Sequence, residues 1–170
     1  MLLVLLWHAV LFSPAQAPTA ANQIKAVFLY NFTQFVNWPP SSLGNSNTPF
    51  VIGVLGTDPF GSYLENVVEG ERVEGHPIVV QRFADAKEVR YCQILFINKS
   101  NAAEIAKNLN NDGMLTVSDA ENFATGGGMI RFYLENNKIR FQINTRAARA
   151  ANLTISSKLL RLASVLDNQP

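Results

Sequence analysis

The sequence contains three consecutive glycines, Gly126, Gly127 and Gly128, which could form a phosphate-binding loop. Glycine loops cradle phosphate when they follow a strand and lead into a helix, whose first N–H groups then bind the anion. Here the order is reversed, because the triplet follows a helical pattern and precedes a strand pattern. Met129 and Ile130 come next, so neither the Walker motif nor the dinucleotide-binding motif is matched. We therefore predict a structural turn and keep a phosphate cradle as the less favoured alternative.

Other reactive side chains are few. The 170 residues include one cysteine, Cys92, and two histidines, His8 and His76. One thiol cannot form an intrachain disulfide, and this set does not make a typical zinc site. His8 lies in the apolar segment that we predict below to be a signal peptide, so a Ser-His-Asp triad would need His76. His76 lies between a glycine and a proline, which is a poor place to hold an imidazole in two hydrogen bonds. We expect no catalytic centre, no metal and no cofactor. Cys92 precedes an apolar run and is predicted to be buried, with an intermolecular disulfide as the alternative.

Polar side chains follow three of the predicted strands, where open parallel sheets bind ligands. Asp58 follows the first strand and Asn98 ends the third, while Ser118 and Asp119 end the fourth. Because such ends share one edge of a sheet, these side chains could form a ligand or partner site, to which we also assign Phe60. Helix capping is the favoured alternative for most of them. An enzyme that uses the two aspartates is a minor alternative, because the sequence sets neither their separation nor their pKa.

Three further residues are candidates for contact with a protein partner. Trp38 ends a predicted helix beside two prolines and could anchor a partner if exposed, although packing in the core is favoured. Arg146 and Arg149 belong to the stretch 138–161, which has six basic residues and no acidic one. The segment 58–74 is mainly acidic, and such asymmetry can steer a partner or orient a dimer. Ordinary exposed helix surfaces explain the basic residues equally well.

The hydrophobic pattern predicts short buried strands that alternate with helices. Strands are predicted at 49–56, 78–82, 92–98 and 114–119. Helices are predicted within 21–38, 57–70 and 99–112, with a helical turn or short helix at 84–91 and a short helix before the glycines at 120–125. Alternation around Asn136-Asn137 predicts a hairpin, and residues 145–166 predict a helix with a break near 152–155. This pattern indicates an α/β fold, with a mostly parallel flavodoxin-like or Rossmann-like sheet, helices on both faces, and a C-terminal antiparallel hairpin plus helix. We expect the flavodoxin-like strand order 2-1-3-4 for the parallel strands.

The first residues differ in composition from the rest. Residues 1–12 are almost wholly apolar and lead to Ala15-Gln16-Ala17, which resembles a secretory signal peptide cleaved after Ala17. The absence of a basic residue before this run is unusual, and a membrane anchor or a buried helix is the alternative. We expect residues 18–170 to form a single domain in the periplasm, without a permanent membrane span. The net charge of +1 gives no general attraction for nucleic acid.

Five segments in order resemble the YfiR family of bacterial periplasmic proteins. They are "KAVFLYNFTQFVNWP", "VLGTDPFG", "CQILFIN", "LTVSDAENFATGGGMIRF" and "RFQINTRAARAANLTISSKLLRLA". They extend from Lys25 to Ala163 and so cover nearly all of the predicted mature chain. The resemblance departs from the best-known members in one respect, because those carry more cysteines and use disulfides.

The resemblance implies a regulator of the α/β class and not an enzyme. The best-known member binds the periplasmic sensor region of a membrane-bound diguanylate cyclase and represses cyclic-di-GMP synthesis, and release of that block promotes biofilm formation. Other members are fused to sensor kinases, so the partner here could be a cyclase or a kinase, and a homodimer is possible. The alternative is a periplasmic small-molecule-binding module that acts with a histidine kinase or transporter and uses the strand ends at Asp58, Asn98 and Ser118.

Overall fold

The structure, a computed structural model, describes residues 17–110 and 112–166, and all but the last residue of the predicted signal peptide lies outside the described residues. The helices are α1 (Ala20–Phe35), α2 (Tyr63–Val68), α3 (Ala102–Asn108), α4 (Thr145–Ala150) and α5 (Ser157–Leu160), with short 3₁₀ turns η1 (Pro40–Ser42) and η2 (Ala86–Glu88). The strands are β1 (Val36–Asn37), β2 (Phe50–Gly56), β3 (Arg72–Val73), β4 (His76–Phe83), β5 (Ile94–Asn98), β6 (Leu115–Ser118), β7 (Ile130–Glu135), β8 (Lys138–Asn144), β9 (Thr154–Ile155) and β10 (Ser164–Leu166). No helix of the described ranges is long and apolar enough to cross a membrane.

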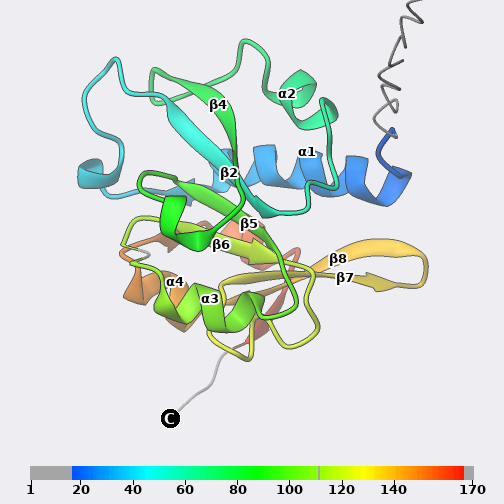
Figure 1. Ribbon diagram of the computed structural model, residues 1–170. Helices are drawn as coiled ribbons and strands as arrows, with labels where there is room; N and C mark the ends of the chain where they lie inside the picture. Colours follow the sequence, from blue (N-terminus) through cyan, green and yellow to red (C-terminus); the bar gives the residue numbers. More distant parts are fainter. Residues whose placement is uncertain (1–16, 111, 167–170) are drawn as a thin grey trace, which may run out of the picture.

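The strands form one curled, mostly parallel sheet in the order β10-β8-β7-β6-β5-β2-β4-β3 (Figure 1). At its centre β4, β2, β5 and β6 are all parallel, and the four strands predicted from sequence therefore lie in the order 2-1-3-4. The strands β1 and β9 form a separate antiparallel pair. The parallel centre follows from the sequence, because strands buried on both faces read as continuous apolar runs.

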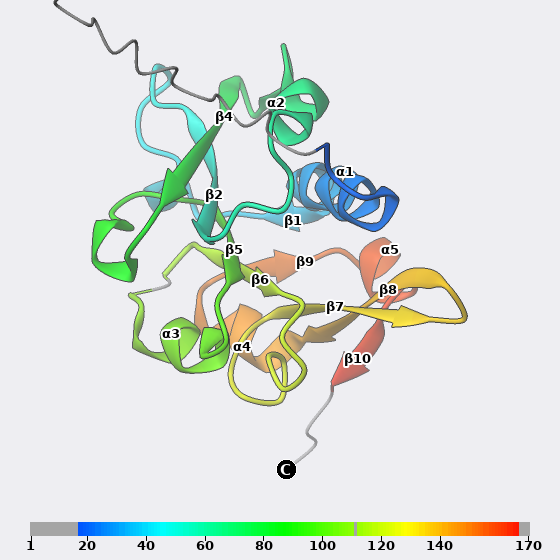
Figure 2. The ribbon, with the colours of Figure 1, turned by 45° about the vertical axis from the view of Figure 1, so that its right-hand side comes forward.

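Helices cover both faces of this sheet (Figure 2). Along β2, Ile52 and Val54 belong to the cluster beneath α1 and α2, whereas Val51 and Leu55 belong to the cluster beneath α3. This division follows from the alternation of side chains along a strand. The α/β architecture with helices on both faces thus has two apolar layers, one on each side of the central strands.

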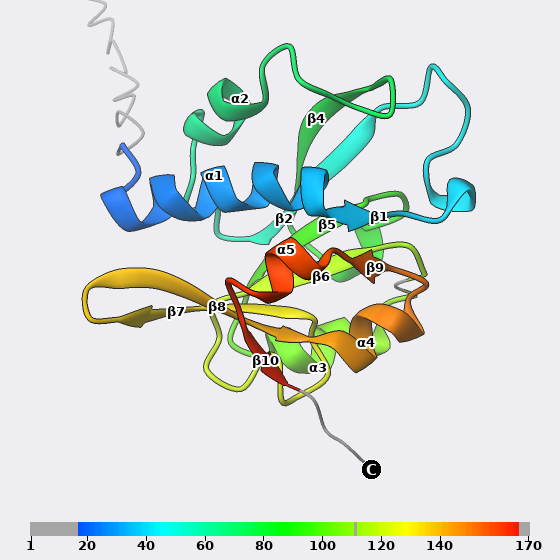
Figure 3. The same ribbon diagram turned by 180° about the vertical axis from the view of Figure 1, so that it is seen from behind.

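Helix α1 lies across the sheet (Figure 3). Its aromatic side chains pack onto β7 and β8. The ring of Phe32 lies 5.9 Å from that of Phe132 and 5.6 Å from that of Phe141, and Phe28 contacts the same two rings. The helix begins after Thr19, whose hydroxyl accepts from the N–H of Asn22. It ends at Phe35, before the predicted end at residue 38, because the chain turns into β1 and pairs with β9.

The chain after β6 follows the sequence-based expectation in some places and differs from it in others. Residues 121–127 form successive turns where a short helix was predicted. β7 and β8 pair antiparallel around Asn136 and Asn137, whose φ values of 49° and 58° suit a two-residue hairpin turn. The break predicted near residues 152–155 is confirmed: the chain forms two short helices, α4 and α5, because Asn152 has a φ of 58° and β9 follows it. The final strand β10 pairs parallel with β8 and was not predicted.

The glycine triplet lies between these turns and β7. An added Cβ at Gly126 would come within 2.7 Å of the Ala103 side chain, and one at Gly128 would come within 2.3 Å of the Phe123 ring. Gly127 has a φ of 108°, a conformation that other residues rarely adopt. The three glycines therefore let the chain turn tightly against buried neighbours before it enters the sheet.

Replacing Gly128 with alanine should reduce the free energy of unfolding by about 2 kcal/mol or more, because the new methyl group overlaps the wholly buried ring of Phe123. Urea unfolding of Gly128→Ala, Phe123→Leu and the double variant measures the effect. The smaller leucine should relieve the overlap, so the double variant should lose less stability than the sum of the single variants. Additive losses would contradict this packing argument. Gly70→Ala is the control, because a Cβ there meets nothing within 4 Å and costs only its left-handed backbone, about 1 kcal/mol.

Candidate functional site

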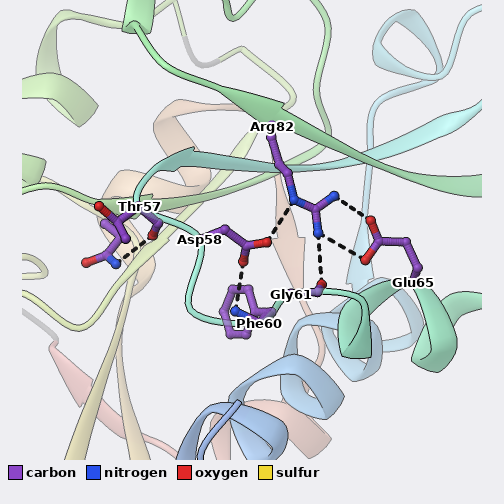
Figure 4. A network of polar contacts seen from close by, with 7 residues as sticks. Thr57, Asp58, Phe60, Gly61, Glu65 and Arg82 are labelled. Carbon is purple, nitrogen blue, oxygen red and sulfur yellow. Dashed lines mark hydrogen bonds and ion pairs between the residues drawn. The ribbon is translucent and has the colours of Figure 1, made fainter. Parts of the chain in front are cut away.

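Arg82, near the end of β4, joins two carboxylates from the segment that follows β2 (Figure 4). Its Nε donates to Asp58 Oδ2 at 2.8 Å, and its Nη2 donates to Glu65 Oε2 at 3.0 Å and to the Gly61 carbonyl at 2.9 Å. Its Nη1 donates to the other carboxylate oxygen of Glu65, so this contact is bidentate. A bidentate pair fixes the orientation of both side chains as well as their distance.

This network shapes the turn between β2 and α2. Asp58 Oδ1 accepts from the N–H of Phe60 at 2.8 Å, which closes an Asx turn. Asp58 therefore caps a turn and not a helix, since α2 begins at Tyr63. The turn directs Phe60 into the core, where its ring lies 4.9 Å from that of Phe96 and is wholly buried. The assignment of Phe60 to a binding surface is corrected, because an apolar ring at this position is removed from solvent.

The charges of the network shift one another's pKa values. The hydrogen bond from Arg82 lowers the pKa of Glu65 below its ordinary value of 4.5, while partial burial opposes this change. The hydrogen bond to Glu65 is also the main cause that raises the pKa of Arg82, with Asp58 adding to it. Arg82 thus stays charged and favours the ionised form of Glu65 at neutral pH.

The remaining predicted rim residues are engaged within the fold. Asn98 Nδ2 donates to the Thr57 carbonyl at 2.7 Å. The Ser118 hydroxyl is buried, donates to the Ile97 carbonyl at 2.7 Å and accepts from the N–H of Ala120. Ser118 is therefore corrected from a candidate ligand residue to a side chain that satisfies buried backbone groups.

Asp119 is exposed and forms an ion pair with Lys25 of α1, with Nζ and Oδ2 2.6 Å apart. Asp58 follows β2 and Asp119 follows β6, and β5 lies between these strands. Each aspartate is paired with a cation of its own, Arg82 or Lys25. The structure does not join them into a shared acid–base pair.

Trp38 is buried, which confirms the favoured prediction of core packing and corrects the alternative of an exposed anchor for a partner. Only 6% of its surface is exposed, its indole N–H donates to the Gln93 carbonyl at 3.1 Å, and its ring packs edge-on against Phe50 at 4.9 Å. An indole with a satisfied N–H and an apolar partner is typical of a core position. Arg146 and Arg149, in contrast, are exposed on α4.

Among the described residues, the reactive side chains of His76 and Cys92 are enclosed. His76 is buried and its Nδ1 lies 2.7 Å from the Thr48 carbonyl. Cys92 is buried, its thiol donates to the Ile94 carbonyl at 2.8 Å, and burial raises its pKa to about 12. Within residues 17–110 and 112–166, no group of three or more His, Cys, Asp or Glu residues could hold a metal ion.

Sequence analysis missed Arg82, Lys25 and Arg131. Arg82 lies at the carboxyl end of a predicted strand, so the rule that selected Asp58 could also have selected it. Lys25 gives no such signal, because only the packing of α1 over the end of β6 brings it to Asp119. Arg131 alternates with buried residues of β7 and lines a surface cavity with Lys25 and Asp119.

Replacing Arg82 with glutamine should lower the free energy of unfolding at pH 7 by about 1 kcal/mol, the upper end for an exposed ion pair. The loss should shrink as the pH falls below 4.5 and through the lowered pKa of Glu65, because stability from a depressed carboxylate pKa disappears when that carboxylate is protonated. Urea unfolding across this pH range measures it. Arg140→Gln is the matched control, because it removes a looser and more exposed ion pair. The Nε of Arg140 lies 3.7 Å from Glu135 Oε2, and both side chains are about half exposed. Equal losses in the two variants at pH 7 would contradict a special role for Arg82.

Cys92 in the folded protein should resist alkylation by iodoacetamide at pH 8. With a pKa of about 12, the thiolate fraction at that pH is about one in ten thousand, and burial also blocks access to the sulfur. Mass spectrometry should find the alkyl group only after denaturation in urea. Rapid labelling of the native protein would show that the thiol is accessible and would restore the intermolecular disulfide as an alternative.

Comparison with known proteins places these observations in a family. No curated protein matches the chain. A family model described as YfiR/HmsC-like matches residues 22–164, which run from the first turns of α1 to the start of β10. The match includes the Arg82 network, the glycine turn and the hairpin. The chain therefore belongs to the YfiR/HmsC-like family.

Proposed function

We propose that this protein is an exported regulator that binds and represses the periplasmic sensor region of a membrane signalling protein, in the first instance a diguanylate cyclase. The observation that carries the proposal is the family match over residues 22–164. The YfiR-like family is regulatory and non-catalytic, and it is known for periplasmic control of diguanylate cyclases. Control of cyclic-di-GMP and biofilm formation follows from this assignment.

The side chains at the sheet edge argue against catalysis there. Asp58, Glu65 and Asp119 each pair with a cation, and Asn98 and Ser118 bond to backbone carbonyls. A general base needs a pKa near the working pH and access to substrate, and the Glu65 pKa is moved in the opposite direction. The same engagement argues against the alternative of a ligand site formed by Asp58, Asn98 and Ser118.

The basic surface of α4 is the part of the chain that we propose contacts the partner. Arg146 and Arg149 are three residues apart and lie on the same side of the helix. Both are exposed, and neither forms an ion pair with any residue of the described ranges. Unpaired arginines on a short, well-anchored helix can meet acidic groups of a partner without first breaking an internal contact.

Deleting the gene should raise the cellular concentration of cyclic-di-GMP, and wild-type protein supplied in trans should restore it. The variant Arg146→Glu with Arg149→Glu should fail to restore it, because the reversed charges repel an acidic partner surface. Mass spectrometry of nucleotide extracts gives the concentration. An unchanged concentration in the deletion strain would count against the link to a cyclase and would direct attention to a kinase partner.

The matched control is Lys138→Glu with Arg140→Glu, which makes the same charge change at exposed positions of the hairpin. This control should restore the low cyclic-di-GMP concentration. Both double variants must reach wild-type abundance, as checked by immunoblot. If the α4 variant represses as well as the hairpin variant, the contact lies elsewhere on the protein.

A further inference from the structure

A surface cavity of about 470 Å³ lies where β6 ends and β7 continues beside α1. Only Ile130 and Arg131 of β7 are in register with β6, so the strand runs on to Glu135 without a neighbour on that edge. The cavity is lined by Ala21, Lys25, Asp119, Arg131, Phe132, Tyr133, Leu134 and Ile139. Its volume falls in the range of small-molecule sites, roughly 300–1,000 Å³.

Arg131 has a hydrogen-bonding capacity that the fold leaves unused. Its Nε is shielded from solvent and has no hydrogen-bond partner among residues 17–110 and 112–166. Its guanidinium carbon lies 5.7 Å from the centre of the Tyr133 ring. This cation–π contact holds the guanidinium in place but gives its N–H groups no oxygen or nitrogen acceptor. A shielded donor without a partner costs free energy, so an acceptor that reaches this guanidinium would be bound favourably.

The charge of Arg131 is also uncompensated within the cavity. The other two ionic residues of the lining, Lys25 and Asp119, neutralise each other at 2.6 Å. This leaves one positive charge, which a monovalent anion balances and a phosphate dianion exceeds. A carboxylate in addition matches the planar guanidinium, because it can accept two parallel N–H bonds.

The rest of the lining is largely apolar and suits a ligand that carries an apolar group beside its carboxylate. Ala21, Leu134 and Ile139 present apolar surface, and 63% of Leu134 is exposed. An apolar group that covers this leucine would remove surface from water on binding. We infer that this cavity is a binding site for a small organic carboxylate whose anionic group meets Arg131 and whose apolar body rests on the α1–β7 wall.

This site is separate from the proposed partner surface on α4, and its test uses the purified protein without any partner or cell. The probe is 3-phenylpropionate, and the neutral amide 3-phenylpropanamide is its matched control. Titration is followed by nuclear magnetic resonance of the backbone amides and of the arginine Nε–H groups. The carboxylate should give saturable shifts at residues 131–134 and at Arg131 Nε–H, and the amide should bind at least about tenfold more weakly, as expected when a charge-assisted contact is lost.

Arg131→Gln should weaken binding of the carboxylate at least about tenfold and should remove the preference over the amide. Arg140→Gln, which removes an exposed charge from the adjacent strand, should leave both unchanged. Equal affinity for carboxylate and amide in the wild-type protein, or shifts away from the cavity, would overturn the inference, and this comparison needs no variant to fold. The absence of saturable shifts at millimolar concentration would overturn it as well.

Discussion

The packing of α1 against the hairpin is the contact on which the rest of the structure depends. Phe28 and Phe32 near the start of the described chain meet Phe132 and Phe141 more than 90 residues later. Aromatic pairs of this kind contribute about 0.5–1.5 kcal/mol each beyond the burial of their area. Because α1 lies across the sheet in this way, Lys25 reaches Asp119, Trp38 enters the core, and the wall of the Arg131 cavity is complete.

Two connections between elements of the sheet are fixed by different kinds of interaction. At β2 and β4 the connection into α2 is fixed by ionic contacts of Arg82, which set the turn and direct Phe60 inward. At β6 and β7 the connection is fixed by sterics, because the glycines lie too close to Ala103 and Phe123 to carry side chains. The first device depends on pH and salt, whereas the second depends on neither.

The parallel centre of the fold could be predicted from sequence, because β2 and β5 are apolar runs that only a sheet covered on both faces can bury. Short elements could not, since β1, β3, β9 and β10 are two or three residues long and exist only through their neighbours. Asp58 and Asp119 lie at the sheet edge, and the burial of Trp38 was the favoured prediction, whereas the burial of Phe60 and Ser118 was not foreseen. Whether these side chains are buried depends on contacts between distant segments, which a local sequence pattern does not reveal.

The lone cysteine has a consequence for how this chain reaches its folded state. Cys92 is enclosed beside β2 and bonded to a backbone carbonyl, so every contact that holds the fold is non-covalent. Folding then has no oxidation step to wait for and no wrong disulfide to correct within one chain. The same native structure is accessible in reducing and in oxidising surroundings, and a thiol reductant is neutral toward its stability.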